Sequence, residues 1–373
     1  MIRVLVVGQT PPPYGGQAIM IESLLEGPLP GVELRHVRMA FSRSMDELGR
    51  FSAHKLVHLG SVIGQVVWQR LQHRPQVLYY PPSGPARAAL LRDCAILLST
   101  RWLFDKTVLH FHAGGTAQLA ATLSAPERLL FRLAFDRPDC TIRTSPLAPH
   151  DGDAIRSKLD RVVPNGVEDV FEQYATLRHS SGKRRPVILF AGLLCSSKGI
   201  GVLVEAAGLL AKQGLEFEIR AMGAWQSPEL REQMLARVAS LSLADRVHFP
   251  GVLTGPEKYR AFAQADVFCF PSYFEAETFG VAVLEAMSFE LPVVTTDWRG
   301  LPALVEDGRT GFVVPVRDAH AVASKLALLL GDPERRQQMG QAGRAVFLRG
   351  FTRSRYLEGM RDVFLAVGGG MDP

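Results

Sequence analysis

The sequence predicts an α/β protein made of two doubly wound domains, and three observations lead to this prediction. The chain has 373 residues, which is long for one hydrophobic core. Short runs rich in β-branched and aromatic residues alternate along it with amphipathic helical stretches. The alternation stops in a polar, charged stretch at 169–185 and starts again at 186. Two such blocks favour two parallel sheets, each covered by helices.

The first block, residues 1–168, is predicted to be the N-terminal domain. Its predicted strands are 3–8, 33–37, 76–80, 107–112, 140–144 and 161–165. Its predicted helices are 17–26, 46–74, 85–100, 124–135 and 149–158.

The second block, residues 186–351, is predicted to be the C-terminal domain, with 169–185 as the linker before it. Its predicted strands are 186–192, 216–223, 246–251, 265–272, 291–297 and 310–316. Its predicted helices are 199–214, 227–242, 255–264, 279–289 and 318–330, and further helices follow within 333–367.

The composition excludes several classes of protein. The chain is 47% hydrophobic and 21% charged, and it has no apolar run long enough to span a bilayer. Its four cysteines are scattered without a CxxC pair, which fits the reducing cytoplasm and gives no zinc signal. The GxGxxG fingerprint is absent, so a nicotinamide-dependent dehydrogenase is not favoured.

Positive charge is concentrated in the N-terminal half. Residues 1–165 hold 19 Lys and Arg against 13 Asp and Glu, a balance of +6, whereas the remainder has 23 against 24, a balance of −1. Residues 48–92 contain no acidic residue, and the predicted helix there carries Trp68 among basic and apolar residues. Such a helix can lie on an anionic membrane surface, or it can pack on the sheet with a solvated basic edge. No nucleic-acid reader motif is present, and nucleic acid is not an expected partner.

Ligands of doubly wound sheets bind beyond the carboxyl ends of the strands, and two such places stand out in the first block. Gly15 and Gly16 open a helix after the first strand, where backbone N–H groups can approach a phosphate, although a simple tight turn explains them equally well. His110 and His112 alternate along a strand and so point the same way. His112 is predicted to end that strand before a glycine pair, which favours a functional over a structural histidine.

In the second block, a lysine and two acids occupy corresponding places. Lys198 sits in a Ser/Gly loop before a helix, where it can meet phosphate or be a solvated loop lysine. Glu277 precedes a mostly apolar helix and Glu285 lies within it. A carboxylate inside an apolar helix is costly unless donors such as ligand hydroxyl groups meet it. The plain alternative is that Glu277 caps the helix and Glu285 is exposed.

The segment 277–287, Glu-Thr-Phe-Gly-Val-Ala-Val-Leu-Glu-Ala-Met, resembles the signature of retaining glycosyltransferases of family 4, which have the GT-B fold. The match to this family extends over nearly the whole chain in the same order. The other matching segments are "PPYGGQ" at 12–17, "VVPNGVEDVF" at 162–171, "KGIGVLVEAA" at 198–207 and "LPVVTTDWRGLPALVEDGRTGFVVPV" at 291–316. The resemblance implies two Rossmann-like domains facing each other across a cleft, with a C-terminal helix at about 352–373 packing back on the first domain.

The resemblance also implies a role for each candidate residue of the second domain. Glu285 would accept hydrogen bonds from the ribose of a nucleotide sugar, and Glu277 would hold hydroxyls of the donor sugar. The N–H groups around Phe279 and Gly280 would face sugar and phosphate, and Lys198 would neutralise the diphosphate. From the first domain, the Gly15–Gly16 turn would approach the diphosphate, and His112 would lie near the reacting centre.

The family's reaction is a same-face substitution in which the leaving diphosphate helps to deprotonate the acceptor. The resemblance therefore implies no metal and no cofactor beyond the UDP- or GDP-linked sugar donor. One departure is Leu193, which stands where the family often has an arginine. Ser196, Ser197 or another basic residue such as Arg299 could replace that phosphate contact.

The function predicted from the sequence is transfer of a hexosyl unit to a glycan or polyprenyl-linked acceptor in cell-surface polysaccharide biosynthesis. The enzyme would be cytoplasmic, and peripheral on the inner face of the membrane if the basic helix binds lipid. The alternatives are a catalytically silent GT-B partner subunit and a GT-B nucleotide-sugar epimerase.

Overall fold

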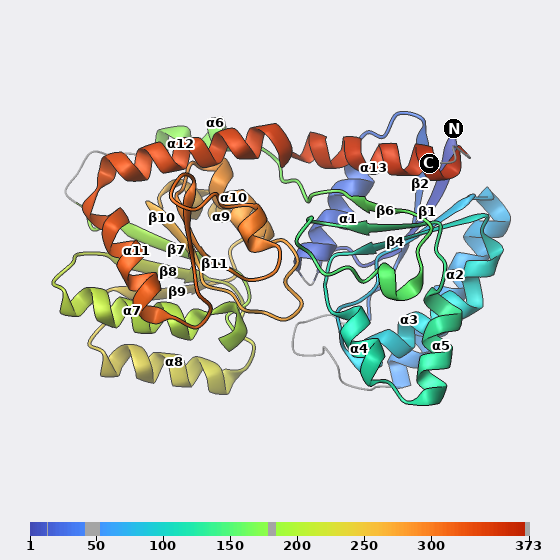
Figure 1. Cartoon of the computed structure of the whole chain (residues 1–373), viewed down its shortest axis with the longest axis horizontal. Coiled ribbons are helices and arrows are strands. Elements are labelled where there is room, and N and C mark those ends of the chain that lie inside the picture. Colours follow the sequence, from blue (N-terminus) through green and yellow to red (C-terminus); the bar gives the residue numbers. More distant parts are fainter. Residues whose placement is uncertain (13, 42–52, 178–183, 370–373) are drawn as a thin grey trace. The chain divides into compact units, whose positions relative to one another are not determined.

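The computed structural model describes residues 1–12, 14–41, 53–177 and 184–369. The chain divides into two compact units (Figure 1). The first, called unit 1, comprises Met1–Gly166 with Arg353–Pro373, and the second, unit 2, comprises Val167–Thr352. None of the helices in the described residues is both long and apolar enough to cross a membrane.

Unit 1 is built on a six-stranded parallel sheet with the strand order β2-β1-β3-β4-β5-β6. All six strands predicted for this block are present. They are β1 (Ile2–Gly8), β2 (Val32–Arg38), β3 (Val77–Tyr80), β4 (Lys106–Phe111), β5 (Cys140–Arg143) and β6 (Asp160–Val162).

Helices cover both faces of the sheet of unit 1, because buried side chains of its strands point alternately to the two faces. Leu5 and Val7 of β1 belong to the core that also contains Val62 and Val66 of the helix α2. On the other face Tyr356, near the C-terminus, donates a hydrogen bond from its hydroxyl to the backbone oxygen of Met20, 3.2 Å away. The helices are α1 (Gly16–Glu26), α2 (Ala53–His73), α3 (Arg87–Thr100), α4 (Thr116–Thr122), α5 (Ala125–Phe135) and α13 (Arg353–Gly368).

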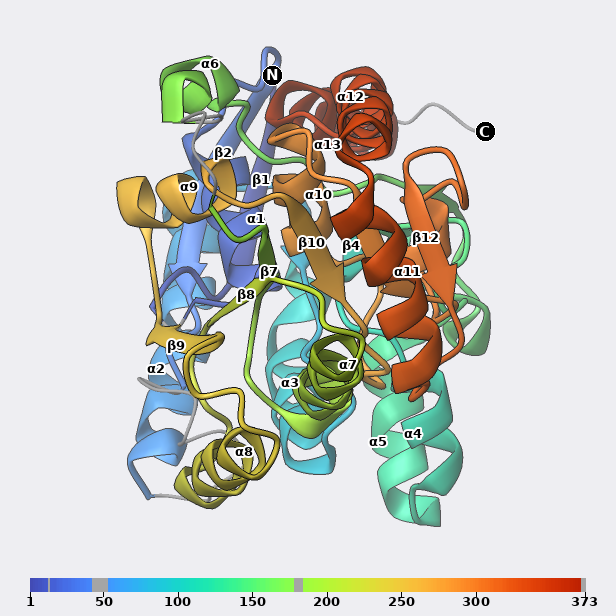
Figure 2. The same cartoon turned by 90° about the vertical axis from the view of Figure 1, so that its left-hand side faces the viewer.

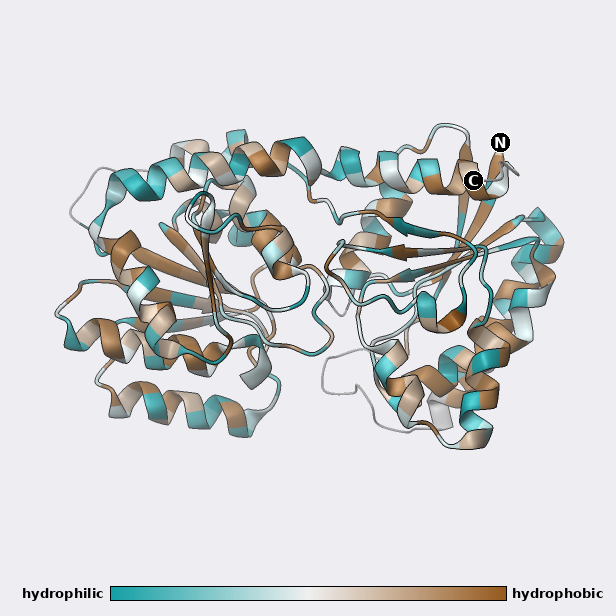
Figure 3. Ribbon diagram, in the orientation of Figure 1, coloured by the Kyte–Doolittle hydropathy of each residue, from teal (hydrophilic) through white to brown (hydrophobic). Residues whose placement is uncertain are grey.

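Unit 2 repeats the architecture with the strand order β12-β11-β10-β7-β8-β9, again parallel. The two central strands of this sheet, β7 and β10, are hydrophobic and buried throughout (Figure 3), which is typical of a sheet covered on both faces. The strands of unit 2 are β7 (Val187–Ala191), β8 (Glu218–Met222), β9 (Val247–Gly251), β10 (Val267–Phe270), β11 (Val293–Thr296) and β12 (Gly311–Val314).

The helices of unit 2 surround this sheet (Figure 2), with α7 packed against both α8 and α11, and α10 against α12. Their bounds are α6 (Phe171–Tyr174), α7 (Ile200–Lys212), α8 (Pro228–Ser240), α9 (Gly255–Ala263), α10 (Val281–Ser288), α11 (Ala319–Gly331) and α12 (Pro333–Gly350). Both sheets place their strand carboxyl ends along one edge each, and these two edges carry the candidate site residues.

Several predicted elements differ from the structure. The helix predicted at 149–158 is wrong: only a 3₁₀ turn, Asp153–Ile155, forms there. The side chain of Asp151 in this segment instead accepts hydrogen bonds from the backbone N–H groups of Gly115 and Ala117, which fixes an irregular loop. Helix α4, which Gly115 precedes in a left-handed conformation, was not predicted, because its seven residues include only one large apolar side chain, Leu119, and so show no apolar stripe.

The remaining differences concern element ends. The long helix predicted at 46–74 is described from Ala53, since 42–52 lie outside the described residues. The range 169–185, predicted as a linker, contains the short helix α6, and its residues 178–183 are likewise outside the described part. Helix α6 is tied to unit 2, where the guanidinium of Arg344 lies 4.1 Å from the ring centroid of Phe171 and pairs with Asp169 at 2.9 Å.

Candidate functional site

The candidate residues of unit 2 lie on two loops that follow the adjacent strands β7 and β10, except Glu285, which lies on helix α10. Gly199, directly after Lys198, has φ +85°, and a Cβ added there would come within 2.1 Å of the backbone oxygen of Pro271. The backbone N–H of Tyr273 donates to the oxygen of Ser197 at 2.7 Å. A side chain at residue 199 would therefore separate the loops, and glycine keeps them in contact.

Lys198 and Glu277 form an ion pair between these loops. The Lys198 Nζ lies 2.5 Å from Glu277 Oε2, and their side chains are only 17% and 9% exposed. The ammonium also lies 5.1 Å and 4.9 Å from the ring centroids of Phe270 and Phe274, at cation–π distance. The predicted lysine is thus not a solvated loop residue.

A second ion pair holds the other predicted acid. Glu285 on α10 accepts from Lys258 on α9, with 2.6 Å between Nζ and Oε1 and side-chain exposures of 15% and 22%. Sequence reasoning missed Lys258, because nothing near it in the chain distinguishes it from an ordinary surface lysine of an amphipathic helix. Its role follows only from the packing that brings α9 beside Glu285.

The alternative in which Glu277 caps the helix and Glu285 is exposed is wrong. Helix α10 begins at Val281, later than the predicted residue 279, and its N-cap residue is Gly280. Glu277 therefore lies in a buried loop before the helix, 7% exposed. Both acids are largely enclosed, and each is compensated by one lysine.

Phe279 and Gly280 connect this loop to α10. Gly280 has φ +84°, and an added Cβ would come within 2.7 Å of the Leu301 side chain. Phe279 is 2% exposed and packs edge-on against Phe351 with ring centroids 5.7 Å apart. Rigid packing on both sides fixes the backbone that follows Glu277.

The loop after β11 completes this edge of the sheet. Trp298 donates from Nε1 to the backbone oxygen of Phe274 at 2.7 Å. A Cβ added at Gly300 would lie 1.7 Å from the backbone oxygen of Thr278, so the two backbones are in direct contact. Arg299, between Trp298 and Gly300, consequently borders the loop that carries Glu277.

In unit 1, Gly15 and Gly16 follow β1 at the carboxyl edge. Gly15 is the N-cap residue of α1 with an extended backbone (φ −146°), and an added Cβ would meet nothing within 4 Å. Gln17 joins this turn to the end of β3 by donating from Nε2 to the oxygen of Pro81 at 3.2 Å. The fold of unit 1 by itself therefore does not require glycine at position 15.

His112 lies at the same edge, one residue beyond the end of β4 at Phe111, which corrects the prediction that it ends the strand. The rings of His110 and His112 lie on the same side of β4, as predicted, with centroids 3.8 Å apart. Both ring nitrogens of His112 are shielded from solvent, and this burial lowers its pKa to about 3. A side-chain hydrogen bond with Asn165 acts in the opposite direction and raises the pKa, but by less.

His110 lies deeper in the same stack. Burial, followed by the neighbouring His112, holds its pKa well below the ordinary value. Its Nδ1 lies 2.8 Å from the hydroxyl of Tyr79, so the ring is oriented by β3. Both imidazoles are therefore neutral at physiological pH.

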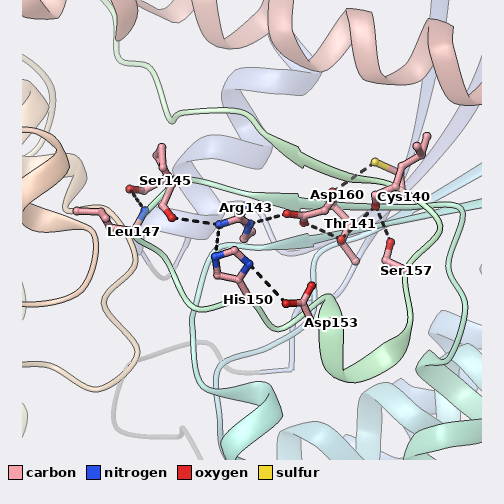
Figure 4. Close-up of polar contacts among 11 residues, drawn as sticks. Cys140, Thr141, Arg143, Ser145, Leu147, His150, Asp153, Ser157 and Asp160 are labelled. Carbon is pink, nitrogen blue, oxygen red and sulfur yellow. Dashed lines mark hydrogen bonds and ion pairs between the residues drawn. The ribbon is translucent and has the colours of Figure 1, made fainter. Parts of the chain in front are cut away.

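A polar network at the end of β5 orders the loop that follows this strand (Figure 4). The guanidinium of Arg143 donates to Asp160 Oδ2 at 2.7 Å and to His150 Nε2 at 3.0 Å. Because arginine can only donate, His150 accepts here as a neutral imidazole. The next residue, Asp151, binds the N–H groups of Gly115 and Ala117, and so anchors the segment that follows His112.

The structure thus brings Lys198, Glu277, Phe279, Gly280 and Glu285 together in unit 2. It places Gly15, Gly16 and His112 at the carboxyl edge of the sheet in unit 1.

Comparison with proteins of known sequence shows related enzymes. Alpha-D-kanosaminyltransferase of Streptomyces kanamyceticus is 31% identical over 175 residues, 46% of this chain and 44% of the relative. The putative colanic acid biosynthesis glycosyltransferase WcaL of Escherichia coli is 35% identical over 146 residues, 38% of this chain and 35% of the relative. The matches therefore span less than half the length of these relatives.

Solved structures share the fold over the full chain. Sucrose-phosphate synthase of Thermosynechococcus elongatus has a TM-score of 0.77 at 19% identity, covering 100% of both chains. HepE of Anabaena in complex with UDP-glucose has a TM-score of 0.75 at 18% identity, covering 98% of this chain and 100% of the other. The family of glycosyl transferases group 1 matches residues 175–346, which contain both ion pairs. The chain thus has the GT-B fold, and its residues 175–346 are similar to the glycosyl transferases group 1.

Proposed function

We propose that the protein is a retaining glycosyltransferase that moves a hexosyl unit from a nucleotide-diphosphate sugar to a glycan or lipid-linked acceptor. The observation that carries this proposal is the pair of enclosed carboxylates, Glu277 and Glu285, each bonded to one lysine at the carboxyl edge of unit 2. Carboxylates in such places can exchange a lysine for ligand hydroxyl groups without losing hydrogen bonds. The relatives named for colanic acid and amylovoran biosynthesis favour cell-surface polysaccharide as the product.

In this proposal each residue of unit 2 meets one part of the donor. Glu285 accepts hydrogen bonds from the ribose hydroxyls and Glu277 from the hydroxyls of the sugar. Lys198, released from Glu277, then faces the diphosphate, and the backbone at Phe279 and Gly280 faces sugar and phosphate. Of the two nucleotides expected, UDP is favoured, because the structural neighbour HepE was solved with UDP and with UDP-glucose.

The proposed reaction is a same-face substitution at the anomeric carbon. The bond from this carbon to the diphosphate oxygen breaks while the bond to the acceptor oxygen forms on the same face. The acceptor proton passes to the departing diphosphate, so the nucleoside diphosphate leaves with that proton. Stabilising the departing charge is then the main task, and Lys198 supplies positive charge for it. We propose that no metal is required, which a transfer assay in EDTA tests directly.

His112 and the Gly15–Gly16 turn are proposed to contribute from unit 1. A neutral His112 can offer one donor and one acceptor to a sugar, in keeping with its lowered pKa. The exposed turn at Gly15 and Gly16 leaves its backbone open to a phosphate.

The acceptor is proposed to be lipid-linked, with the enzyme on the cytoplasmic face of the membrane. The outward face of α2 carries no charged residue between Val57 and Leu71, and its exposed side chains include Val57 (74%), Trp68 (55%) and Leu71 (71%). Trp102, which is 75% exposed, follows α3. It lies near α2, because Arg70 of α2 donates to the backbone oxygen of the next residue, Leu103, at 2.6 Å. Exposed apolar side chains on a segment without acids, 48–92, suit an anionic lipid surface.

Thermal stabilisation by UDP, GDP, ADP and their sugars tests the proposed donor site. A ligand that binds only the folded state raises the melting temperature according to its affinity. We expect a shift with one nucleotide, lost in Glu285→Ala. No shift with any of them would contradict the donor site.

Product analysis then tests the activity itself. Transfer or donor hydrolysis distinguishes a transferase from a silent partner subunit, which gives neither. Formation of an epimerised nucleotide sugar would instead indicate an epimerase, and the anomeric configuration of the product tests retention.

A further inference from the structure

Arg299 is a partly buried cation whose charge nothing in the described residues compensates. Its Nε is shielded from solvent and makes no hydrogen bond, and its side chain takes part in no ion pair within the described chain. An arginine side chain stays protonated under all ordinary conditions and can only donate. Enclosing its Nε without an acceptor costs stability, so the site favours an anionic or hydrogen-bond-accepting ligand.

The position of Arg299 is fixed next to the Lys198–Glu277 pair. Its guanidinium carbon lies 5.5 Å from the ring centroid of Trp298, which donates to the backbone of Phe274. The ring of Phe274 is in turn 4.9 Å from the ammonium of Lys198. Because the backbone of Gly300 touches that of Thr278, the backbone that carries Arg299 is held against the loop of Glu277.

The backbone of Arg299 is itself unfavourable. It has φ +50°, in the left-handed region that a non-glycine residue rarely adopts outside a strict requirement. Glycine would adopt this conformation at no cost, and it would also avoid the uncompensated charge. The sequence thus keeps a residue here that weakens the ligand-free fold in two ways, as functional sites often do.

Two of the cations at this edge of the sheet have ion-pair partners, and Arg299 has none in the part of the chain that the structure describes. Lys198 pairs with Glu277 and Lys258 with Glu285, while Arg299 forms no ion pair within the described residues. Leu193, after β7, adds no charge to this edge. We infer that Arg299 binds the diphosphate of the donor. Lys198 binds the diphosphate as well, after the hydroxyls of the donor sugar have replaced Lys198 as the hydrogen-bond partners of Glu277. This inference rests on the proposed function and adds a phosphate-binding residue to it.

The variant Arg299→Gly separates the fold from the binding. Because glycine suits φ +50°, we expect a melting temperature equal to or above that of the unaltered protein. We also expect the affinity for UDP, measured by calorimetry, to fall by about 10- to 100-fold, as for loss of a charged hydrogen-bond donor. The affinity for uridine, which lacks phosphate, should not change. If the nucleotide panel selects GDP, the probes are GDP and guanosine.

Two matched variants complete the test. Arg299→Lys should recover part of the lost UDP affinity, since it restores the charge. Arg309→Gln, at an exposed arginine of unit 2 that pairs with Glu306, should leave both affinities unchanged.

The outcomes distinguish the inference from the proposed function. Unaltered UDP affinity in Arg299→Gly, with binding lost in Glu285→Ala, would overturn the role of Arg299 and leave the donor site standing. An equal loss of UDP and uridine affinity in Arg299→Gly would also overturn it, because the residue would then act through the fold. Failure of the unaltered protein to bind any nucleotide would overturn the proposed function itself.

Discussion

The ammonium of Lys198 lies 2.5 Å from a carboxylate oxygen of Glu277, so two residues assigned to different parts of one donor are bonded to each other. Each provides the charge that the other needs while it is largely enclosed. In the proposed function a sugar nucleotide replaces both partners at once, because its hydroxyls would donate to Glu277 and its phosphates would accept from Lys198. The ion pair holds the two loops together, and ligand binding would then be an exchange of partners.

Lys198→Met should destabilise the protein, because it leaves the carboxylate of Glu277 enclosed without its cation. We expect the free energy of unfolding to fall by about 3 kcal/mol, as is typical when one partner of a buried pair is removed. Urea denaturation measures this change. The double variant Lys198→Met/Glu277→Gln should regain most of the stability yet bind no sugar nucleotide tightly. A single variant as stable as the unaltered protein would show that the pair is not formed in solution.

Glu285→Gln should weaken nucleoside binding through the ribose alone. We expect the affinities for both UDP and uridine to fall about tenfold or more, because a charged acceptor of hydroxyl hydrogen bonds is lost. The 2′,3′-dideoxy analogue of uridine lacks those hydroxyls and should bind the variant and the unaltered protein equally. Equal losses with uridine and with this analogue would place Glu285 elsewhere than at the ribose.

The strands were the most predictable part of this chain. Buried parallel strands such as β7 and β10 are short, continuous apolar runs, and their carboxyl ends mark where ligands bind. The 149–158 segment failed because hydrogen bonds from Asp151 to a loop distant in sequence decide its conformation. The hydrophobic pattern within a segment contains no information about contacts with residues that are distant in the sequence.

The site residues were predictable by type but not by partner. An acid within an apolar helix indicated that Glu285 needs donors, and the structure confirms that it is enclosed. The sequence could not show that Lys258 meets it, since the contact depends on how α9 packs against α10. The partnerless state of Arg299 was equally invisible, because it depends on the surroundings of the loop after β11.

Two glycines of the candidate site should respond differently to substitution by alanine. Gly199→Ala should lower the free energy of unfolding by about 1–3 kcal/mol, because a Cβ meets the Pro271 backbone and φ is +85°. Gly15→Ala should leave the melting temperature unchanged, because its backbone is extended and its surroundings are open. If the Gly15 turn approaches the diphosphate, that variant should bind the donor several-fold more weakly by calorimetry. Unchanged donor affinity would remove Gly15 from the site.

The stability of the protein should fall as the pH drops below about 6.5, in part through His110 and His112. Both have folded-state pKa values below the unfolded value, that of His112 at about 3, so only the unfolded chain takes up their protons over this interval. Each contributes a slope of up to about 1.4 kcal/mol per pH unit between these limits. His112→Gln should flatten the slope measured by urea denaturation between pH 6.5 and 4. His320→Gln, at an exposed position of α11, should leave it unaltered.

Trp68→Ser combined with Leu71→Ser should abolish binding to anionic vesicles without affecting the fold, because both side chains are more than half exposed. The unaltered protein should co-sediment with vesicles containing 30% phosphatidylglycerol, chosen as a typical anionic fraction, and not with phosphatidylcholine alone. Salt should weaken this binding by screening the basic N-terminal half. Leu235→Ser, at an exposed apolar residue of α8, is the control and should still sediment. Protein that stays in the supernatant with both lipids would leave the α2 face without a membrane role, and the acceptor would then have to reach the enzyme in solution.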